Sequence, residues 1–232
     1  MVEPEDGPLL LRPVVLAGPA AVVFDLDGVL VDSFDVMREA FAVAYAEVVG
    51  AGPPPFEEYS RHMGRYFPDI MAMMGLPGAM EEPFVRESYR LAHRVRVYDG
   101  VPEMLGELRA NRIRLAVATG KSGSRARSLI CILQLHDYFD AVVGSDEVPR
   151  PKPAPDIVLE ALRRIDVAPE AAMMVGDAPT DLASAQAAGV VAVAATWGEG
   201  DDPVLRAASP DALVRNPAQL LELCRMVPKN TS

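Results

Sequence analysis

The sequence predicts an α/β protein with a doubly wound, Rossmann-like parallel sheet and a small all-helical domain inserted after the first strand. After residue 100, short continuously apolar runs alternate with amphipathic segments, as in parallel sheets that helices cover on both faces. Between residues 35 and 98 the pattern is helical instead, without strand-like alternation. The 232 residues, half of them hydrophobic, suffice for one large core and a smaller module.

The expected elements follow in chain order. Residues 21–24 form the first expected strand, and residues 1–20 before it are expected to be a loose extension. Helical periodicity then predicts helices in three segments: around 37–45, over about 67–74 and over about 82–96. Later strands are expected at 115–119, 141–144, 172–176 and 190–195, and later helices at 103–110, 124–133, 156–164 and 182–188. The resulting division is a core domain of residues 1–34 and 99–232 and a helical domain of residues 35–98.

The segment after the first expected strand, residues 25–33, reads Asp-Leu-Asp-Gly-Val-Leu-Val-Asp-Ser. Asp25 and Asp27 stand two positions apart and point the same way on a strand, so their repulsion calls for a cation or a shared proton. Asp32 and Ser33 are expected to cap the following helix. In doubly wound folds ligands bind beyond the carboxyl ends of the strands. More polar residues stand at such strand ends or in the loops after them: Thr119, Lys152, Asp177 and Asp181.

Four motifs carry a resemblance to a known family. They are Asp-Leu-Asp-Gly-Val at 25–29, Ala-Thr-Gly at 118–120, Lys-Pro at 152–153 and Gly-Asp-x-x-x-Asp at 176–181. In this order they resemble the haloacid dehalogenase-like (HAD) hydrolase superfamily, over nearly the whole chain from about residue 20. The resemblance implies a HAD core, and the helical insertion looks like the small cap domain of that superfamily.

The catalytic roles of the family carry over by resemblance. Asp25 would be the nucleophile that attacks phosphorus and forms an aspartyl-phosphate. Asp27 would protonate the leaving alcohol and later deprotonate the hydrolytic water. Thr119 would hydrogen-bond the phosphoryl oxygens, and Lys152 would neutralise charge on Asp25 and on the phosphoryl group.

The resemblance also implies a magnesium site. The side chains of Asp25 and Asp177 and the backbone carbonyl of Asp27 would coordinate Mg²⁺, which prefers oxygen ligands. Asp181 would stand behind these ligands and hold Lys152 or a metal-bound water in place.

Four further residues are candidates for substrate binding. Gly120 and Lys121 follow Thr119, and Lys121 either touches a substrate anion at the rim or is a surface lysine that opens a helix. Arg61 and Arg65 belong to a polar cap cluster that could descend over the site, because arginine suits carboxylate or phosphate. An ordinary polar surface explains this cluster equally well.

The leading functional hypothesis is a Mg²⁺-dependent phosphatase for a small phosphorylated metabolite, a layout that phosphoglycolate phosphatases share. The strings at 118–123 and 144–153 resemble phosphatases associated with 3-amino-5-hydroxybenzoate (AHBA) synthesis in ansamycin pathways, which implies a sugar or aminosugar phosphate and a role in antibiotic biosynthesis. The alternative is a phosphomutase of the β-phosphoglucomutase type. Asp27 argues against haloacid dehalogenases and phosphonate hydrolases, because both differ from the Asp-x-Asp pattern at this position. The retained site charges argue against a non-catalytic interaction module.

Composition narrows the partners and the compartment. The net charge of −11 argues against nucleic acid or anionic membranes as partners. The resemblance implies a small phosphate monoester as the ligand, and the protein is expected to be a monomer or homodimer. No apolar run reaches the length of a membrane span, and acidic residues precede the apolar segment 9–21, unlike a secretory signal. Of the two cysteines, Cys131 is expected to be a buried free thiol. A reducing, cytoplasmic location follows from this cysteine usage.

Overall fold

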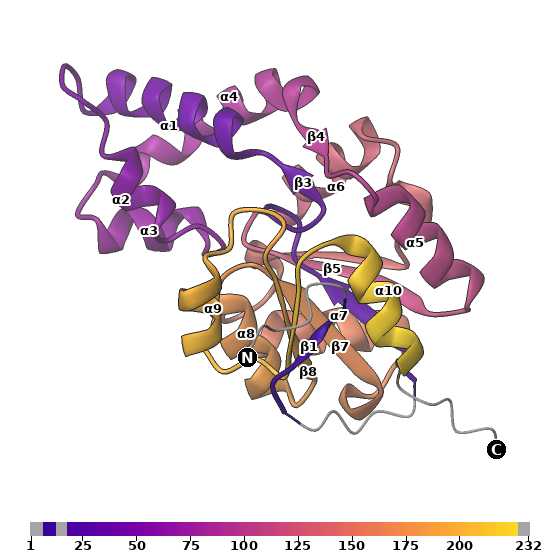
Figure 1. Ribbon diagram of the computed structural model, residues 1–232. Helices are drawn as coiled ribbons and strands as arrows, with labels where there is room; N and C mark the ends of the chain where they lie inside the picture. The colour runs from indigo at the N-terminus through magenta and orange to yellow at the C-terminus, as the bar shows by residue number, and fades with distance from the viewer. Residues whose placement is uncertain (1–6, 13–17, 227–232) are drawn as a thin grey trace.

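The computed structural model describes residues 7–12 and 18–226, which form a mostly parallel sheet flanked by helices and a separate helical lobe (Figure 1). The main sheet orders its strands β1-β9-β8-β7-β2-β5-β6, and every neighbouring pair is parallel except β1 with β9. The strands are Leu9–Leu10 (β1), Ala21–Phe24 (β2), Arg114–Thr119 (β5), Ala141–Gly144 (β6), Ala172–Gly176 (β7), Val191–Ala195 (β8) and Ala212–Val214 (β9). The predicted fold class is therefore confirmed.

Strand β2 lies in the middle of this sheet and is buried on both faces. Val22 and Phe24 belong to a hydrophobic cluster that α5, α6 and α10 complete, whereas Ala21 and Val23 belong to a second cluster with α7 and α8. The chain adds β5 and β6 on one side of β2 and then β7, β8 and β9 on the other. The direction of winding reverses at β2, which is where ligands bind in such folds.

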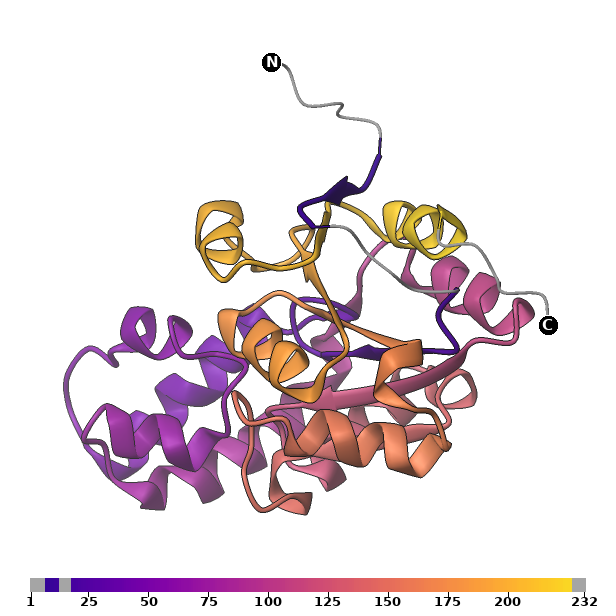
Figure 2. The ribbon, with the colours of Figure 1, turned by 90° about the horizontal axis from the view of Figure 1, so that it is seen from below.

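Helices cover both faces of the sheet, as Figure 2 shows from below. They are Val101–Ala110 (α5), Gly123–Ile132 (α6), Asp156–Ile165 (α7), Pro179–Ala188 (α8), Asp202–Ala207 (α9) and Pro217–Met226 (α10). Short 3₁₀ turns occur at Gly78–Met80 (η1), Ala92–Arg94 (η2), His136–Tyr138 (η3), Ser145–Glu147 (η4) and Pro169–Ala171 (η5). Helix α7 illustrates why these segments are helical, because its buried residues recur at helical spacing: Ile157, Val158, Ala161, Leu162 and Ile165.

The helical insertion forms a cap with a hydrophobic core of its own. It contains Phe34–Val48 (α1), Phe56–Ser60 (α2), Phe67–Met73 (α3) and Glu81–Leu91 (α4). The rings of Phe67 and Phe84 stack in this core with centroids 4.1 Å apart. The chain enters and leaves the cap through two paired antiparallel strands, Val31–Asp32 (β3) and Arg96–Val97 (β4).

Three expectations need correction. The third cap helix, expected to reach residue 96, ends at Leu91 and gives way to η2 and β4, because β4 pairs with a strand from the other end of the insertion. Residues 9–10 of the expected loose extension form β1, while residues 1–6 and 13–17 lie outside the described residues. Cys131 is exposed, since it faces outward from α6 next to buried Leu129 and Ile130; Cys224 is the buried thiol.

In the part of the chain that the structure describes, no helix has the length and apolar character that crossing a membrane requires.

Candidate active site

Asp25 lies in a buried charge cluster at the carboxyl end of β2. Lys152 Nζ is 2.8 Å from Asp25 Oδ1 and 2.5 Å from Asp181 Oδ1, and it also donates to the backbone oxygen of Ala118 at 3.2 Å. The exposed fractions of Asp25 and Lys152 are each 2%, and Asp181 has none. Lys152 comes from the loop after β6 and Asp181 from the first turn of α8, so one ammonium group joins three parts of the fold.

The cluster holds more acidic groups than its single lysine balances. Burial raises the pKa of Asp25 to about 7, Lys152 opposes this shift, and Asp181 and Asp27 add to it. Burial and repulsion from Asp181 and Asp25 likewise raise the pKa of Asp177 well above its ordinary value. Burial alone would lower the pKa of Lys152, but the carboxylates of Asp181 and Asp25 raise it. A bound cation would relieve this repulsion.

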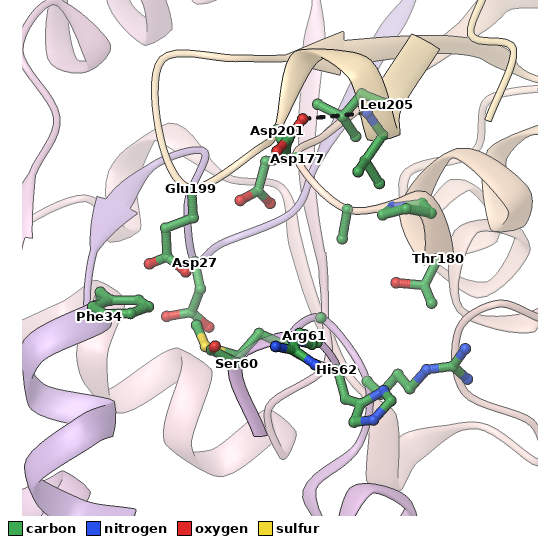
Figure 3. Close-up of a pocket in the computed structure, with 16 residues that line it drawn as sticks. Asp27, Phe34, Ser60, Arg61, His62, Asp177, Thr180, Glu199, Asp201 and Leu205 are labelled. Carbon is green, nitrogen blue, oxygen red and sulfur yellow. Dashed lines mark hydrogen bonds between the residues drawn. The ribbon is translucent and has the colours of Figure 1, made fainter. Parts of the chain in front are cut away.

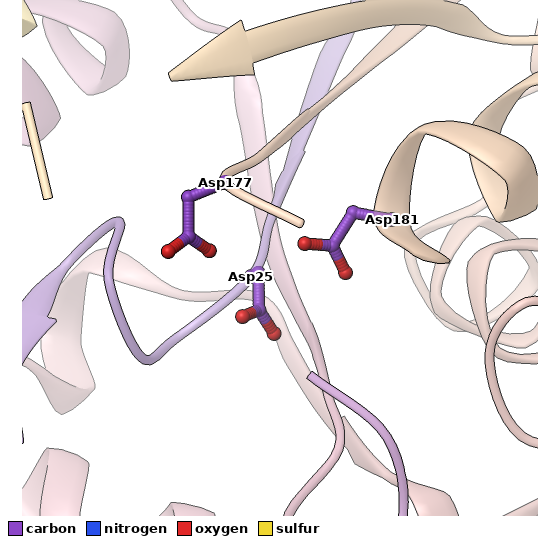
Figure 4. A group of neighbouring side chains, drawn as sticks. All are labelled: Asp25, Asp177 and Asp181. Atoms are coloured by element: carbon purple, nitrogen blue, oxygen red, sulfur yellow. The ribbon is translucent and has the colours of Figure 1, made fainter. Parts of the chain in front are cut away.

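The same acidic groups fit a divalent cation. One carboxylate oxygen from each of Asp25, Asp177 and Asp181 lies within 4.8 Å of the other two (Figure 4). Both oxygens of Asp181 already accept hydrogen bonds, one from Lys152 and the other from Ala178 N at 3.1 Å. Asp181 is thus occupied by protein partners, and the roles of Asp25 and Asp177 as ligands stay a prediction. An all-oxygen donor set is the kind that Mg²⁺ prefers.

The turn after Asp27 brings its backbone against Asp177. Gly28 has a φ of +75°, and a Cβ atom at this position would lie 1.9 Å from Asp177 Oδ2. Glycine is required both for the left-handed backbone and for the close approach. The Asp27 backbone is thereby kept beside the carboxylate with which it is predicted to share a metal ion.

The side chain of Asp27 forms a separate buried ion pair with Lys121. Lys121 Nζ is 2.7 Å from both carboxylate oxygens, and Ser33 Oγ donates to Asp27 Oδ1. Burial would raise the pKa of Asp27, but Lys121 and Ser33 outweigh it and lower the pKa. Burial is also the main reason why the pKa of Lys121 is lowered. Asp27 is therefore held as a carboxylate.

This ion pair corrects two expectations. Lys121 is only 7% exposed, so it is neither a rim residue nor a surface lysine. Ser33 is the N-cap residue of α1 but makes no side-chain capping hydrogen bond, because its hydroxyl binds Asp27 instead. Asp32 does accept a hydrogen bond from Phe34 N, at 3.4 Å.

The loop after β5 supports the cap directly. Thr119 is fully buried, and its Oγ1 accepts a hydrogen bond from Lys121 N at 3.2 Å, which keeps the hydroxyl proton for donation. A Cβ atom on Gly120 would lie 2.6 Å from Gly64 O and 2.7 Å from Arg65 O. The backbone of the loop between α2 and α3, residues 61–66, thus rests on Gly120, a contact that a larger residue would prevent. We call this segment the cap loop.

Between the cap and the core lies a cavity of about 520 Å³ (Figure 3). Its polar lining residues are Asp27, Ser60, Arg61, His62, Arg65, Asp177, Thr180, Glu199 and Asp201. In Figure 3, Asp27 and Glu199 lie on one side of the cavity and Thr180 lies on the other. The cavity therefore opens directly beside the proposed acid and base, Asp27, where a leaving group would be released.

Of the two alternatives for the polar cap cluster, its position beside the cavity favours the loop that lies over the site, but its two arginines differ in environment. Arg61 NH2 lies 2.8 Å from Glu57 Oε1 in an exposed ion pair. Arg65 lines both the cavity and a narrower space beside Asp25 and Lys121. Substrate contact by Arg61 and Arg65 stays a prediction, for which Arg65 has the better position.

Sequence reasoning missed Arg125, a buried cation on α6. It is 7% exposed, donates to Ser88 Oγ at 3.0 Å and lies over the Phe84 ring, 5.1 Å from the centroid. Both of these partners belong to α4 of the cap, so Arg125 ties the cap to the core. Its place next to buried Ala126 and four positions before buried Leu129 is a signal that could have identified it.

Thr180 and Glu199 were missed as well. Thr180 stands directly before Asp181 in the fourth motif, and Glu199 stands between Gly198 and Gly200. A charged residue between two glycines is a weak signal for a loop that packs closely on another backbone.

A doubly wound α/β core that carries a buried acidic cluster under a helical cap defines a recognisable class of hydrolase. The family model described as haloacid dehalogenase-like hydrolase matches residues 22–195. The chain is 34% identical to a phosphoglycolate phosphatase of Chromobacterium violaceum over 221 residues, 88% of this chain and 96% of the relative.

Solved structures agree with this assignment. A haloacid dehalogenase-like family protein of Streptococcus pneumoniae has a TM-score of 0.74 and 28% identity, with 88% of this chain and 97% of that one covered. A protein of Thermotoga maritima assigned as a β-phosphoglucomutase has a TM-score of 0.69 and 28% identity, with 89% and 99% covered. The chain belongs to the haloacid dehalogenase-like hydrolases, and the predicted enzyme class, a phosphatase of this family, is confirmed.

Proposed function

We propose that the protein is a Mg²⁺-dependent phosphatase that hydrolyses a small phosphate monoester through an aspartyl-phosphate on Asp25. The observation that carries this proposal is the position of Asp25, in contact with Lys152 and beside the carboxylate of Asp177. An anionic nucleophile that approaches an anionic phosphoryl group needs positive charge around both. Bound Mg²⁺, held by Asp25, Asp177 and the Asp27 carbonyl, would supply part of that charge.

The proposed reaction has two steps. A carboxylate oxygen of Asp25 attacks phosphorus while the bond to the leaving oxygen breaks, and the leaving oxygen takes a proton from Asp27. Water then attacks the same phosphorus and gives a proton to Asp27, and the bond between phosphorus and Asp25 breaks. The ester and one water become an alcohol and phosphate, and both carboxyl groups return to their initial state. Thr119 donates to a phosphoryl oxygen, and Lys152 counters its charge.

Lys121 couples substrate binding to the protonation of Asp27. Their ion pair favours the ionised form of Asp27, the form that can accept a proton from water. A phosphoryl dianion that attracts Lys121 would weaken the pair and raise the pKa of Asp27 toward the protonated acid that the first step needs. We therefore assign Lys121, together with the backbone of Gly120, to the phosphoryl end of the substrate.

The leaving alcohol would occupy the cavity between cap and core, whose volume of about 520 Å³ suits a small metabolite. Sugar phosphates, aminosugar phosphates and phosphoglycolate-like esters are the proposed substrates. The phosphoglycolate phosphatase among the relatives supports the last of these. The AHBA-related role in ansamycin biosynthesis stays a prediction from the sequence strings alone.

A phosphomutase of the β-phosphoglucomutase type is the second candidate. Its support is the likeness to the Thermotoga maritima protein and the close contact of the cap loop with Gly120. A mutase must shield its aspartyl-phosphate from water until another hydroxyl accepts the phosphoryl group. A closed cap would provide such shielding.

Phosphate release tests the two candidates against each other. The assay compares phosphoglycolate, hexose 6-phosphates, kanosamine 6-phosphate and β-glucose 1-phosphate, each with Mg²⁺ and with EDTA. Metal-dependent release of phosphate supports the phosphatase, whereas conversion of β-glucose 1-phosphate to the 6-phosphate without release supports the mutase. Asp25→Asn should abolish either reaction in a folded protein. Substantial Mg²⁺-dependent turnover by that variant would overturn the assignment of the nucleophile.

A further inference from the structure

Two side-chain oxygens in the cavity lack a partner. Among residues 7–12 and 18–226, Glu199 Oε1 and Thr180 Oγ1 are the buried side-chain atoms without a hydrogen bond inside the protein. Both residues line the cavity beside Asp27. Buried polar atoms are nearly always paired, because removing them from water without a partner costs free energy. Two such atoms beside one cavity are available to bind a ligand in it.

The loop that carries Glu199 is fixed against the catalytic turn. A Cβ atom on Gly198 would lie 1.8 Å from Gly28 O, so the two backbones touch. Trp197 Nε1 donates to Val29 O at 2.9 Å, which ties the same loop to the same turn a second time. The side chain of Glu199 therefore starts from a rigid backbone next to Asp27 and is delivered into the cavity. Such preorganisation is expected of a residue that recognises a ligand.

Thr180 is held equally firmly on the other side. It lies in the first turn of α8, next to Asp181, and is 8% exposed. A Cβ atom on Gly64 of the cap loop would lie 3.2 Å from Thr180 Oγ1, so closure of the cap places this hydroxyl in the wall of the cavity. Figure 3 shows its oxygen directed inward, toward the side where Asp27 and Glu199 lie.

We propose that Glu199 and Thr180 recognise the leaving alcohol and that this alcohol carries hydrogen-bond donors, as a sugar or an aminosugar does. The inference rests on the proposed phosphatase function and makes its substrate more specific. A carboxyl group that is ionised, or that is protonated on its other oxygen, accepts a hydrogen bond at Oε1, so the partner of this atom is a hydroxyl or an ammonium group. Glu199 lies next to Asp27 in the cavity, so it adds a second acidic group at this point, which disfavours a carboxylate on the leaving group there. Sugar phosphates are therefore favoured over phosphoglycolate.

The test compares substrates that share the phosphate and differ in the leaving group. We would measure kcat/KM for glucose 6-phosphate, glucosamine 6-phosphate, phosphoglycolate and p-nitrophenyl phosphate, whose leaving group has no hydrogen-bond donor. Glu199→Ala should lower kcat/KM for the sugar phosphates about 10-fold or more. Its kcat/KM for p-nitrophenyl phosphate should stay within about twofold of the wild-type value. Thr180→Val replaces the hydroxyl by a methyl group and nearly keeps the shape of the side chain. It should lower kcat/KM for the sugar phosphates by a smaller factor. Glu58→Gln, an exposed residue of α2 outside the cavity lining, is the control.

Glu199→Gln separates the two kinds of donor. The amide retains a carbonyl acceptor but not the charge. If the partner is a hydroxyl, kcat/KM should therefore fall much less in Glu199→Gln than in Glu199→Ala. If the partner is an ammonium group, kcat/KM should fall about equally in both variants. Equal losses for p-nitrophenyl phosphate and the sugar phosphates would overturn the inference, because Glu199 would then act on the phosphoryl end or on folding. Unchanged sugar phosphate hydrolysis in Glu199→Ala, or a wild-type preference for phosphoglycolate, would overturn it and leave the phosphatase intact. Absence of phosphate release from every ester would overturn the proposed function itself.

Discussion

Lys121 Nζ lies 2.7 Å from both carboxylate oxygens of Asp27, although the two residues are 94 positions apart in the chain. Their side chains are 7% and 16% exposed, so solvent screens the pair only weakly. The pair joins the loop after β5 to the turn after β2, at the point where the cap loop rests on the core. Lys121 therefore contributes both to the assembly of the site and to the charge state of Asp27.

A double-mutant cycle on this pair should reveal strong coupling. Lys121→Met leaves the Asp27 carboxylate buried without its cation, so we expect the free energy of unfolding to fall by about 2–4 kcal/mol. Adding Asp27→Asn removes that uncompensated charge, and the double variant should recover about 1–3 kcal/mol relative to additivity. Urea titration at pH 7 in EDTA measures all four proteins. Additive effects would contradict the proposed coupling.

The exposed pair of Arg38 with Asp35 provides the control for this cycle. Its two side chains are 59% and 74% exposed, so water screens the attraction. Arg38→Met should change the free energy of unfolding by no more than about 1 kcal/mol.

Gly120 should be essential for cap closure. Its Cβ position lies 2.6 Å from the carbonyl oxygen of Gly64, so Gly120→Ala must push the cap loop away from the core. We expect kcat/KM to fall about 10-fold or more, while the free energy of unfolding changes little because the clash can be relieved by opening the cap. Steady-state kinetics and urea titration measure the two quantities.

Gly106, on α5, is the matched control for Gly120. A Cβ atom there would meet nothing within 4 Å, and alanine is favoured over glycine inside a helix. Gly106→Ala should therefore keep full activity and stabilise the fold by up to about 1 kcal/mol. If both alanine variants kept full activity, contact of the cap loop with Gly120 would not matter for turnover.

The strands that precede the catalytic residues could be predicted from the sequence, because each is a short apolar run. The apolar runs at 141–144 and 172–176 coincide with β6 and β7, and the run 21–24 coincides with β2. A short apolar run that ends in Asp or Thr can be recognised as a strand without knowledge of the elements that pack against it. The order of the motifs then places Asp25 and Lys152 in one site.

The parts that escaped prediction depend on distant neighbours. Ala212–Val214 is a strand because β8 and β1 pair with it, and its three residues carry no periodic pattern. Ser33 looks like a helix cap, but its hydroxyl binds Asp27, six positions away. Glu199 reaches the cavity because Trp197 binds a backbone oxygen 168 positions away. The spacing of residues along the sequence does not predict such long-range contacts.

The pH dependence of stability should carry a contribution from Glu199. Burial and repulsion from Asp27 raise the pKa of Glu199 from 4.5 to about 8. The folded state therefore favours the protonated form, which stabilises the fold fully below pH 4.5 and is lost as the pH rises from 4.5 through 8. Glu199→Gln is neutral at every pH, so its unfolding free energy should fall less steeply over this window.

Urea titrations in EDTA between pH 5 and 8.5 would measure this slope in both proteins. EDTA is needed because a bound cation would stabilise the neighbouring carboxylates and obscure the effect. Glu58→Gln, at an exposed position, should follow the wild-type slope. Parallel slopes for Glu199→Gln and wild type would mean that Glu199 ionises as freely in the folded chain as in the unfolded one.

Lys152 should make the apo protein stable and should limit how strongly the cation stabilises it. Its ammonium is fully buried between Asp25 and Asp181, so Lys152→Met leaves these carboxylates without their counter-charge. We expect the free energy of unfolding in EDTA to fall by about 3–5 kcal/mol and turnover to be lost. Because the remaining carboxylates repel one another more strongly, Mg²⁺ should raise the melting temperature of the variant by more than it raises that of wild type. Arg163→Met, which breaks an exposed pair with Glu160, should show the wild-type response to Mg²⁺. A smaller Mg²⁺ response in Lys152→Met than in wild type would mean that the lysine organises the metal ligands and does not merely neutralise them.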